Sequence, residues 1–140
     1  TYALGMTSRE QNFDGTIELG LSVLGAQLAT EGIKSLELER RPNGSDYKSF
    51  PSGHAAAAFS SAMFVHRRYG WKPAIIPYAM AAVTGWGRVR ADAHYWHDVL
   101  GGAAVSALFT WLVVDKYDAA QNITVAATPD NIHVGFKTEF

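Results

Sequence analysis

Three uncharged, largely apolar stretches constrain the fold of this chain most strongly: Ala55 to Val65, Ala74 to Trp86 and Val99 to Val114. All three are shorter than the roughly 18 to 20 residues that cross the hydrocarbon core of a bilayer. Helices of this length and composition are usually buried in a protein core. We therefore expect a helical protein, and association with a membrane stays open as an alternative.

Apolar spacing and capping residues predict where the helices begin and end. Asp14 is a good N-cap for an amphipathic helix to about Leu36, whose apolar stripe would consist of Ile17, Leu21, Leu24 and Leu28. Further helices are expected from Gly53 to about Tyr69 behind a Ser52 cap, from Pro73 to about Trp86, and from Asp92 to about Lys116. We expect Pro77 to bend or delay the third helix, Gly85 and Gly87 to form a turn, and the last, nearly all-apolar helix to be buried on most sides.

The end of the chain has a different pattern. From Asn122 to Phe140, apolar and polar residues alternate around a Thr-Pro-Asp-Asn segment, which predicts two short strands and a turn. The 140 residues amount to about one domain. We predict a single domain over residues 1–140, with a helical core at about 14–118 and a strand-like tail at 119–140.

Composition excludes several classes of function. The formal net charge is −1, so the chain lacks the overall basic field with which nucleic-acid-binding proteins attract phosphates. The absence of cysteine rules out disulfides, thiolate metal sites and a cysteine nucleophile. The sequence shows no evident set of metal ligands. Any chemistry on anions must therefore come from local clusters of polar residues.

Three segments, each beside a predicted helix end, hold nearly all the polar residues with catalytic potential. Lys34 precedes a basic loop, Arg40 to Phe50, with Pro and Asn-Gly turn chemistry. Ser52, Gly53 and His54 form a helix N-terminus of the kind that binds phosphate. In the third segment, Arg88 is followed by His94 and Asp98. These last two would share one face of a helix, although that spacing does not require them to bond each other.

The order and spacing of these segments resemble the three-part signature of the type 2 phosphatidic acid phosphatase superfamily. Lys34 with Arg41-Pro42 matches K-x6-R-P, Pro51 to His54 is P-S-G-H, and Arg88, His94 and Asp98 match R-x5-H-x3-D. Gly87 stands where the third motif usually has serine. The resemblance covers about two thirds of the chain.

This resemblance implies a role for each matched residue. Lys34, Arg41 and Arg88 would bind phosphate oxygens, together with the Ser52 hydroxyl and the Gly53 N–H. His94 would attack phosphorus, and Asp98 would orient its ring. His54 would protonate the leaving alkoxide and then activate water.

The resemblance also implies an all-α bundle of about four to five helices, to which the alternating pattern at the C-terminal end would add a short hairpin. The expected activity is hydrolysis of phosphate monoesters on lipids or lipid-like molecules through a phosphohistidine, with no metal or other cofactor, although vanadate or phosphate can occupy such sites. We expect a periplasmic or membrane-associated protein of the bacterial cell envelope that binds a phosphorylated lipid or small molecule and no nucleic acid. A phosphotransferase moving phosphate between lipids and a vanadium haloperoxidase are the alternatives.

The remaining polar and aromatic residues receive structural interpretations. We expect structural roles for His66, His97 and His133, with His97 pointing away from the site. The four tryptophans, Trp71, Trp86, Trp96 and Trp111, are expected in the core or an interface. Solvated charges are expected at Arg40, Lys48, Arg67, Arg68, Lys72 and Arg90.

Overall fold

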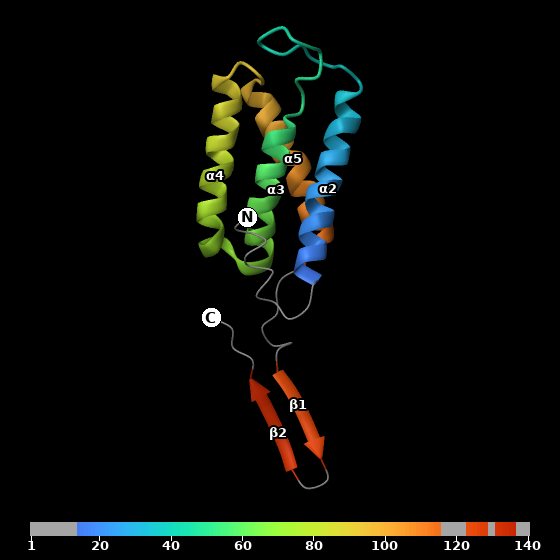
Figure 1. The fold of residues 1–140 in the computed structure, drawn as a ribbon, viewed down its shortest axis with the longest axis vertical. Helices are drawn as coiled ribbons and strands as arrows, with labels where there is room; N and C mark the ends of the chain where they lie inside the picture. Colours follow the sequence, from blue (N-terminus) through green and yellow to red (C-terminus); the bar gives the residue numbers. More distant parts are fainter. Residues whose placement is uncertain (1–13, 116–122, 129–130, 137–140) are drawn as a thin grey trace.

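The computed structural model describes residues 14–115, 123–128 and 131–136. Its helices are α2 (Asp14–Lys34), α3 (Gly53–Tyr69), α4 (Trp71–Arg90) and α5 (Trp96–Val113). Figure 1 shows α3 between α2 and α4, and α3 packs against each of the other three helices. The prediction of an all-α bundle is confirmed.

A two-stranded hairpin follows the bundle in sequence. Strands β1 (Ile123–Thr128) and β2 (Asn131–Phe136) pair antiparallel, with Thr128 opposite Asn131. The predicted hairpin is therefore confirmed. The assignment of residues 1–140 to one domain, with a core at 14–118, stays a prediction.

The interior of the bundle is lined by small and polar side chains. On α5 the buried residues recur every fourth position, as Asp98, Gly102, Ser106 and Thr110. The Thr110 hydroxyl lies 2.9 Å from that of Ser22 on α2, and the Ser106 hydroxyl donates to the Ala56 carbonyl of α3 at 2.6 Å. Small residues allow helix backbones to approach closely, and hydroxyl hydrogen bonds join the helices where they meet.

The large apolar residues of the same helices face outward, which corrects the predicted orientation. The predicted core stripe of α2, made of Ile17, Leu21, Leu24 and Leu28, is between 53% and 73% exposed. Helix α5 is not buried on most sides, because Leu100 and Leu112 are 69% and 72% exposed. The four tryptophans, Trp71, Trp86, Trp96 and Trp111, are at least half exposed and so are not core residues. Within the described residues, no helix combines the length and apolar character that a membrane span requires.

Two predicted helix boundaries near the site are also wrong. Gly85 and Gly87 lie inside α4, which continues past Pro77 to Arg90. Gly85 is needed there because a Cβ at this position would lie 2.6 Å from Val99 of α5. Helix α5 begins at Trp96 rather than Asp92, because Asp98 Oδ2 accepts a hydrogen bond from the Tyr95 N–H at 2.7 Å and so caps the first turn.

An apolar core closes the end of the bundle where α3 meets α4. Phe64 and Val65 of α3 are fully buried there with Leu19 and Val114. Arg68 lies at the same end, only 7% exposed, and its guanidinium is 2.9 Å from the Glu18 carboxylate. The predicted solvated role of Arg68 is therefore wrong. The opposite end of the bundle carries the two loops that hold the predicted site.

Candidate active site

The three predicted segments meet at one end of the bundle. The loop of residues 35–52 and the α4–α5 connection of residues 91–95 lie side by side there (Figure 1), and the Asn43 N–H donates to the Asp92 carbonyl at 3.0 Å. Within the first loop, the Ser49 N–H donates to the Glu39 carbonyl at 3.1 Å. The first of these bonds joins the two loops, and the second closes the longer loop on itself. The site is therefore built from segments that are distant in the sequence.

The His94 ring is buried just before α5, and its tautomer is fixed by a backbone carbonyl. Its Nδ1 lies 2.8 Å from the Ser49 carbonyl oxygen. A carbonyl oxygen only accepts hydrogen bonds, so Nδ1 carries the proton of the neutral ring and Nε2 keeps a lone pair. His94 thus has the unprotonated ring nitrogen that a nucleophile needs.

Asp98 supports this arrangement mainly through Ser49. Its Oδ2 accepts hydrogen bonds from the Ser49 hydroxyl at 2.5 Å and the Tyr95 N–H at 2.7 Å, whereas His94 Nδ1 is 3.5 Å away. Asp98 is fully buried and lies on α5, while His94 precedes that helix. The two residues therefore do not share one helix face as predicted, and Asp98 approaches His94 across the helix N-terminus.

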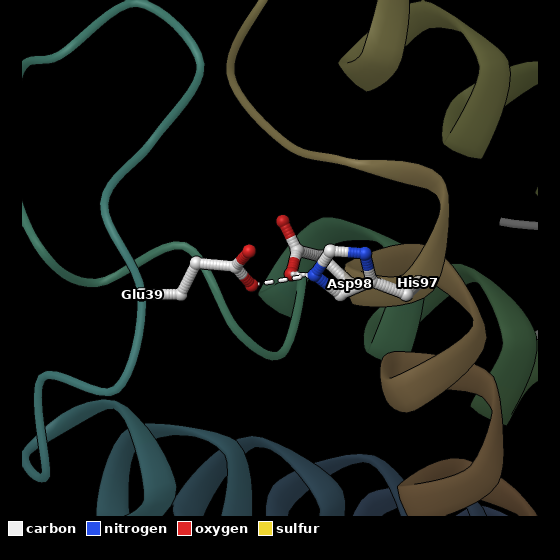
Figure 2. A group of neighbouring side chains, drawn as sticks. All are labelled: Glu39, His97 and Asp98. Atoms are coloured by element: carbon white, nitrogen blue, oxygen red, sulfur yellow. Dashed lines mark hydrogen bonds and ion pairs between the residues drawn. The ribbon is translucent and has the colours of Figure 1, made fainter.

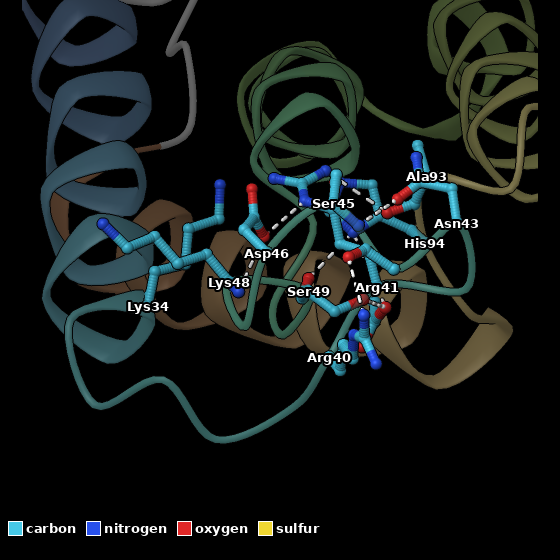
Figure 3. Close-up of polar contacts among 12 residues, drawn as sticks. Lys34, Arg40, Arg41, Asn43, Ser45, Asp46, Lys48, Ser49, Ala93 and His94 are labelled. Carbon is cyan, nitrogen blue, oxygen red and sulfur yellow. Dashed lines mark hydrogen bonds and ion pairs between the residues drawn. The ribbon is translucent and has the colours of Figure 1, made fainter.

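Arg41 reaches the free nitrogen of His94 from the basic loop. Its NH1 lies 3.3 Å from His94 Nε2 and donates to the Ala93 carbonyl at 3.2 Å, while its Nε donates to Asp46 at 2.8 Å (Figure 3). The guanidinium has no acceptor, so Nε2 must be the acceptor of the shared contact. The pairing with Asp46 aims a fixed positive charge at the nitrogen.

The N-terminus of α3 adds backbone groups to the site, and Lys34 at the end of α2 lies beside it. The Ser52 hydroxyl accepts a hydrogen bond from the Ala55 N–H at 3.3 Å, as a helix cap does, and the Ser52 N–H donates to the Asp98 carbonyl at 2.9 Å. Lys34 Nζ would lie 3.3 Å from a Cβ built on Gly53. A glycine at this position therefore leaves room for the lysine beside the first turn of α3.

Arg88 and His54 complete the cluster. Arg88 lies in the last turn of α4, and its Nε is buried with no hydrogen-bond partner among the described residues. His54 is exposed, and its pKa is lowered by partial burial and then by the charges of Arg88, Lys34 and Arg41. All three predicted phosphate-binding cations therefore lie close enough to act on one imidazole.

Burial and charge together keep the His94 ring neutral. Burial lowers its pKa most, and the neighbouring Arg41 lowers it further. The hydrogen bond to the Ser49 carbonyl and the charge of Asp98 oppose this effect, but the net direction is downward. The ring therefore holds its lone pair at pH values where an exposed histidine would begin to protonate.

Two contributors to the site were not predicted. Ser49 binds both His94 and Asp98, and the Gln27 side chain of α2 donates to the Gly53 carbonyl at 2.8 Å. Ser49 acts on His94 through a backbone carbonyl, which every residue type has, so its identity gave no signal. Gln27 could have been found only from its place about two helical turns before Lys34 on the same helix.

The other histidines have different surroundings. His66 Nδ1 lies 3.0 Å from the Tyr78 hydroxyl, which agrees with a structural role. His97 does not point away from the site, because its Nε2 lies 3.3 Å from Asp98 Oδ1. The side chain of His133 lies outside the described part of the chain.

The sequence and the fold of this chain are similar to those of known proteins. The chain is 33% identical to the lipid A 4'-phosphatase of Helicobacter pylori over 76% of its own length and 60% of that protein. It is 36% identical to the lipid A 1-phosphatase of Porphyromonas gingivalis over 64% of this chain and 20% of that one. The crystal structure of the first transmembrane PAP2 type phosphatidylglycerolphosphate phosphatase from Bacillus subtilis aligns with a TM-score of 0.64 and 27% identity, covering 80% of this chain and 63% of that one.

The chain thus spans about 60% of the Helicobacter relative, and less of the Porphyromonas one. Residues 15–121, which include every predicted site residue, match the sequence profile of the PAP2 superfamily. With the bundle, the motif spacing and the clustered cations in agreement, the chain belongs to the PAP2 superfamily.

Proposed function

We propose that this chain is a phosphatase that hydrolyses phosphate monoesters of lipids through a phosphohistidine on His94. The observation that carries the proposal is an unprotonated ring nitrogen facing a cationic site. His94 Nε2 keeps its lone pair beside Arg41, and the buried Nε of Arg88 has no hydrogen-bond partner among the described residues. A phosphate oxygen would supply the acceptor that Arg88 lacks.

In the first step, the Nε2 lone pair of His94 attacks phosphorus in line with the ester oxygen. The P–N bond forms, the P–O bond to the lipid breaks, and His54 gives its proton to the leaving alkoxide. Charge on the equatorial oxygens is balanced by Lys34, Arg41 and Arg88. The same cations lower the pKa of free His54, so the bound phosphate dianion is what restores the proton that His54 must donate.

In the second step, water attacks phosphorus opposite the imidazole. Neutral His54 takes a proton from this water, the P–N bond breaks, and the lone pair returns to His94 Nε2 as inorganic phosphate forms. The proton on Nδ1 stays hydrogen-bonded to the Ser49 carbonyl throughout, which supports the imidazole as both nucleophile and leaving group. No step requires a metal or another cofactor.

We place the reaction on a lipid phosphate at the bacterial cell envelope, with the outer face of the bundle in contact with lipid. Two features support this assignment. The named relatives act on lipid A or are described as a phosphatidylglycerolphosphate phosphatase. Large apolar residues on α2, α4 and α5 are exposed, and contiguous exposed apolar surface is typical of membrane or protein contact.

A phosphotransferase remains the second candidate, because the same phosphohistidine can pass phosphate to another lipid. The experiment that separates the candidates measures inorganic phosphate released from a lipid A-type phosphate, from phosphatidic acid and from a soluble sugar phosphate. We expect release from the lipids and about a 10⁴-fold or greater loss in His94→Asn. Equal rates in both proteins would exclude His94 from the reaction, and transfer to an added lipid without release would favour the phosphotransferase.

A further inference from the structure

Glu39, His97 and Asp98 form a second cluster of side chains that could bind a ligand, and this cluster shares Asp98 with the active site. Figure 2 shows the Glu39 carboxylate of the loop meeting the His97 ring, with Asp98 beside it on α5. His97 Nε2 is 2.5 Å from Glu39 Oε2 and 3.3 Å from Asp98 Oδ1. One ligand atom from each residue lies within 4.8 Å of the others.

The orientation of the His97 ring is set by two aromatic neighbours. Tyr95 stacks on it with ring centroids 5.3 Å apart and planes 9° from parallel, and Phe50 stacks at 6.3 Å and 29°. These rings hold an otherwise exposed histidine with Nε2 directed at the two carboxylates. A ring fixed in this way loses little conformational freedom when it binds a ligand.

One oxygen of the buried Asp98 carboxylate indicates that the cluster can bind a further ligand. Asp98 is fully buried, and its Oδ1 accepts no hydrogen bond from any described residue. Leaving a buried carboxylate oxygen without a donor is unfavourable unless a cation or water occupies its free side. That free side faces His97 and Glu39.

We propose that Glu39, His97 and Asp98 bind a divalent cation of the zinc type at the surface of the bundle. An imidazole nitrogen with two carboxylate oxygens suits Zn²⁺, whereas Mg²⁺ and Ca²⁺ take oxygen ligands. Tetrahedral ligands about 2.0–2.2 Å from zinc lie roughly 3.4 Å apart. The spacing of His97 and Asp98 already fits, and the partly exposed Glu39 side chain needs to move away from His97 by about 1 Å.

The position of Asp98 would couple this site to the reaction, a step that rests on the proposed function. Its Oδ1 faces the cluster, and its Oδ2 holds the Ser49 hydroxyl beside His94. A cation on Oδ1 neutralises part of the carboxylate charge that stabilises a positively charged His94 ring. Bound zinc should therefore slow formation of the phosphohistidine.

Isothermal titration of the untagged chain with Zn²⁺ and with Mg²⁺ tests the site without any substrate. We expect one saturable Zn²⁺ site and no comparable Mg²⁺ binding, with Zn²⁺ affinity at least about tenfold weaker in Glu39→Gln and in His97→Gln. Glu37→Gln, at an exposed glutamate in the same loop, is the matched control and should bind as the unmodified chain does. Absence of saturable Zn²⁺ binding, or equal binding by all four proteins, would overturn the site.

A second measurement tests the coupling. For each protein, the rate of phosphate release with saturating Zn²⁺ is divided by its rate with a chelator, so that variant effects on the basal rate cancel. We expect this ratio to fall at least about threefold below one in the unmodified chain and in Glu37→Gln, and to stay near one in His97→Gln. Zinc binding with an unchanged ratio would contradict the coupling, while loss of activity in chelator would count against the proposed function alone.

Discussion

The loop end of the bundle contains residues 35–52 and 91–95, and the shaft is formed by the helices themselves. The two regions differ in which side chains they bury. At the loop end, ionisable side chains point inward: His94 is 2% exposed and Asp98 is fully buried. Along the shaft, small and hydroxyl-bearing residues fill the interior, while Leu28 and Leu112 are more than 70% exposed. The interior of this protein is therefore organised around close helix contacts and a polar site rather than around a large apolar core.

The difference has a direct consequence for mutational sensitivity. At the loop end the polar side chains serve the proposed reaction, so replacing one of them should change catalysis more than stability. In the shaft the tight contacts involve small residues. Enlarging a buried side chain there should therefore lower the free energy of unfolding more than truncating an exposed one. The following predictions test this division.

After His94→Asn, the largest effect is expected from His54→Gln at the loop end. Loss of a general acid should lower kcat/KM, which reports formation of the phosphohistidine and not its hydrolysis, by about 10²–10⁴-fold for a lipid phosphate. An aryl phosphate whose leaving group needs no proton should lose much less. His66→Gln is the matched control, because His66 contacts Tyr78 outside the site. Equal losses with both substrates would exclude His54 as the proton donor.

On the acidic side of the pH profile, kcat/KM is expected to fall about tenfold for each pH unit. His94 must be neutral to attack, and burial and Arg41 lower its pKa. The profile of kcat/KM should therefore begin to fall only below about pH 6.5, the ordinary histidine value. Because the unfolded chain takes up this proton at higher pH than the folded one, stability should decline over the same range. An acid limb that starts above pH 7 would contradict the neutral, buried ring.

Gly102→Ala tests the tight interior of the shaft. An added Cβ would lie 2.6 Å from the Ser52 carbonyl oxygen and 3.0 Å from the Ala56 nitrogen. We expect the free energy of unfolding to fall by about 1–3 kcal/mol. Gly20→Ala is the control, since nothing lies within 4 Å of its added Cβ, and it should raise stability by about 0.5–1 kcal/mol. Chemical denaturation of both proteins measures the difference, and equal stabilities would refute close packing at α5.

The smallest effect is expected on the outer face. Leu112 is 72% exposed, so Leu112→Ala should change the free energy of unfolding by less than about 0.5 kcal/mol in the same assay. A loss above about 2 kcal/mol would show that this residue is packed, and the contrast between the two faces would then be wrong.

The site was more predictable from sequence than the orientation of the helices. Each site residue carries a chemical requirement at a fixed spacing, so the motif identified Arg88, His94 and Asp98 individually. The periodicity of apolar residues, in contrast, identifies one face of a helix without indicating whether that face is buried or exposed. On α2, the stripe containing Leu24 and Leu28 is as regular as the buried one containing Ser22, Ala26 and Thr30.

Contacts between residues that are distant in the sequence could not be predicted either. The start of α5 depended on Asp98 bonding the Tyr95 N–H, which moved His94 out of the predicted helix. The contact of His97 with Glu39 joins residues 58 positions apart. Such contacts depend on how the two loops pack, and no local pattern encodes that packing.

The most direct test of the central claim is to trap the phosphorylated protein. A rapidly quenched reaction with a ³²P-labelled phosphate ester should leave acid-labile label on one peptide, with the phosphoryl group on His94 Nε2. His94→Asn should carry no label, and His54→Gln should still form it from an aryl phosphate. Label on another residue, or turnover of the ester with His94 never phosphorylated, would contradict the account.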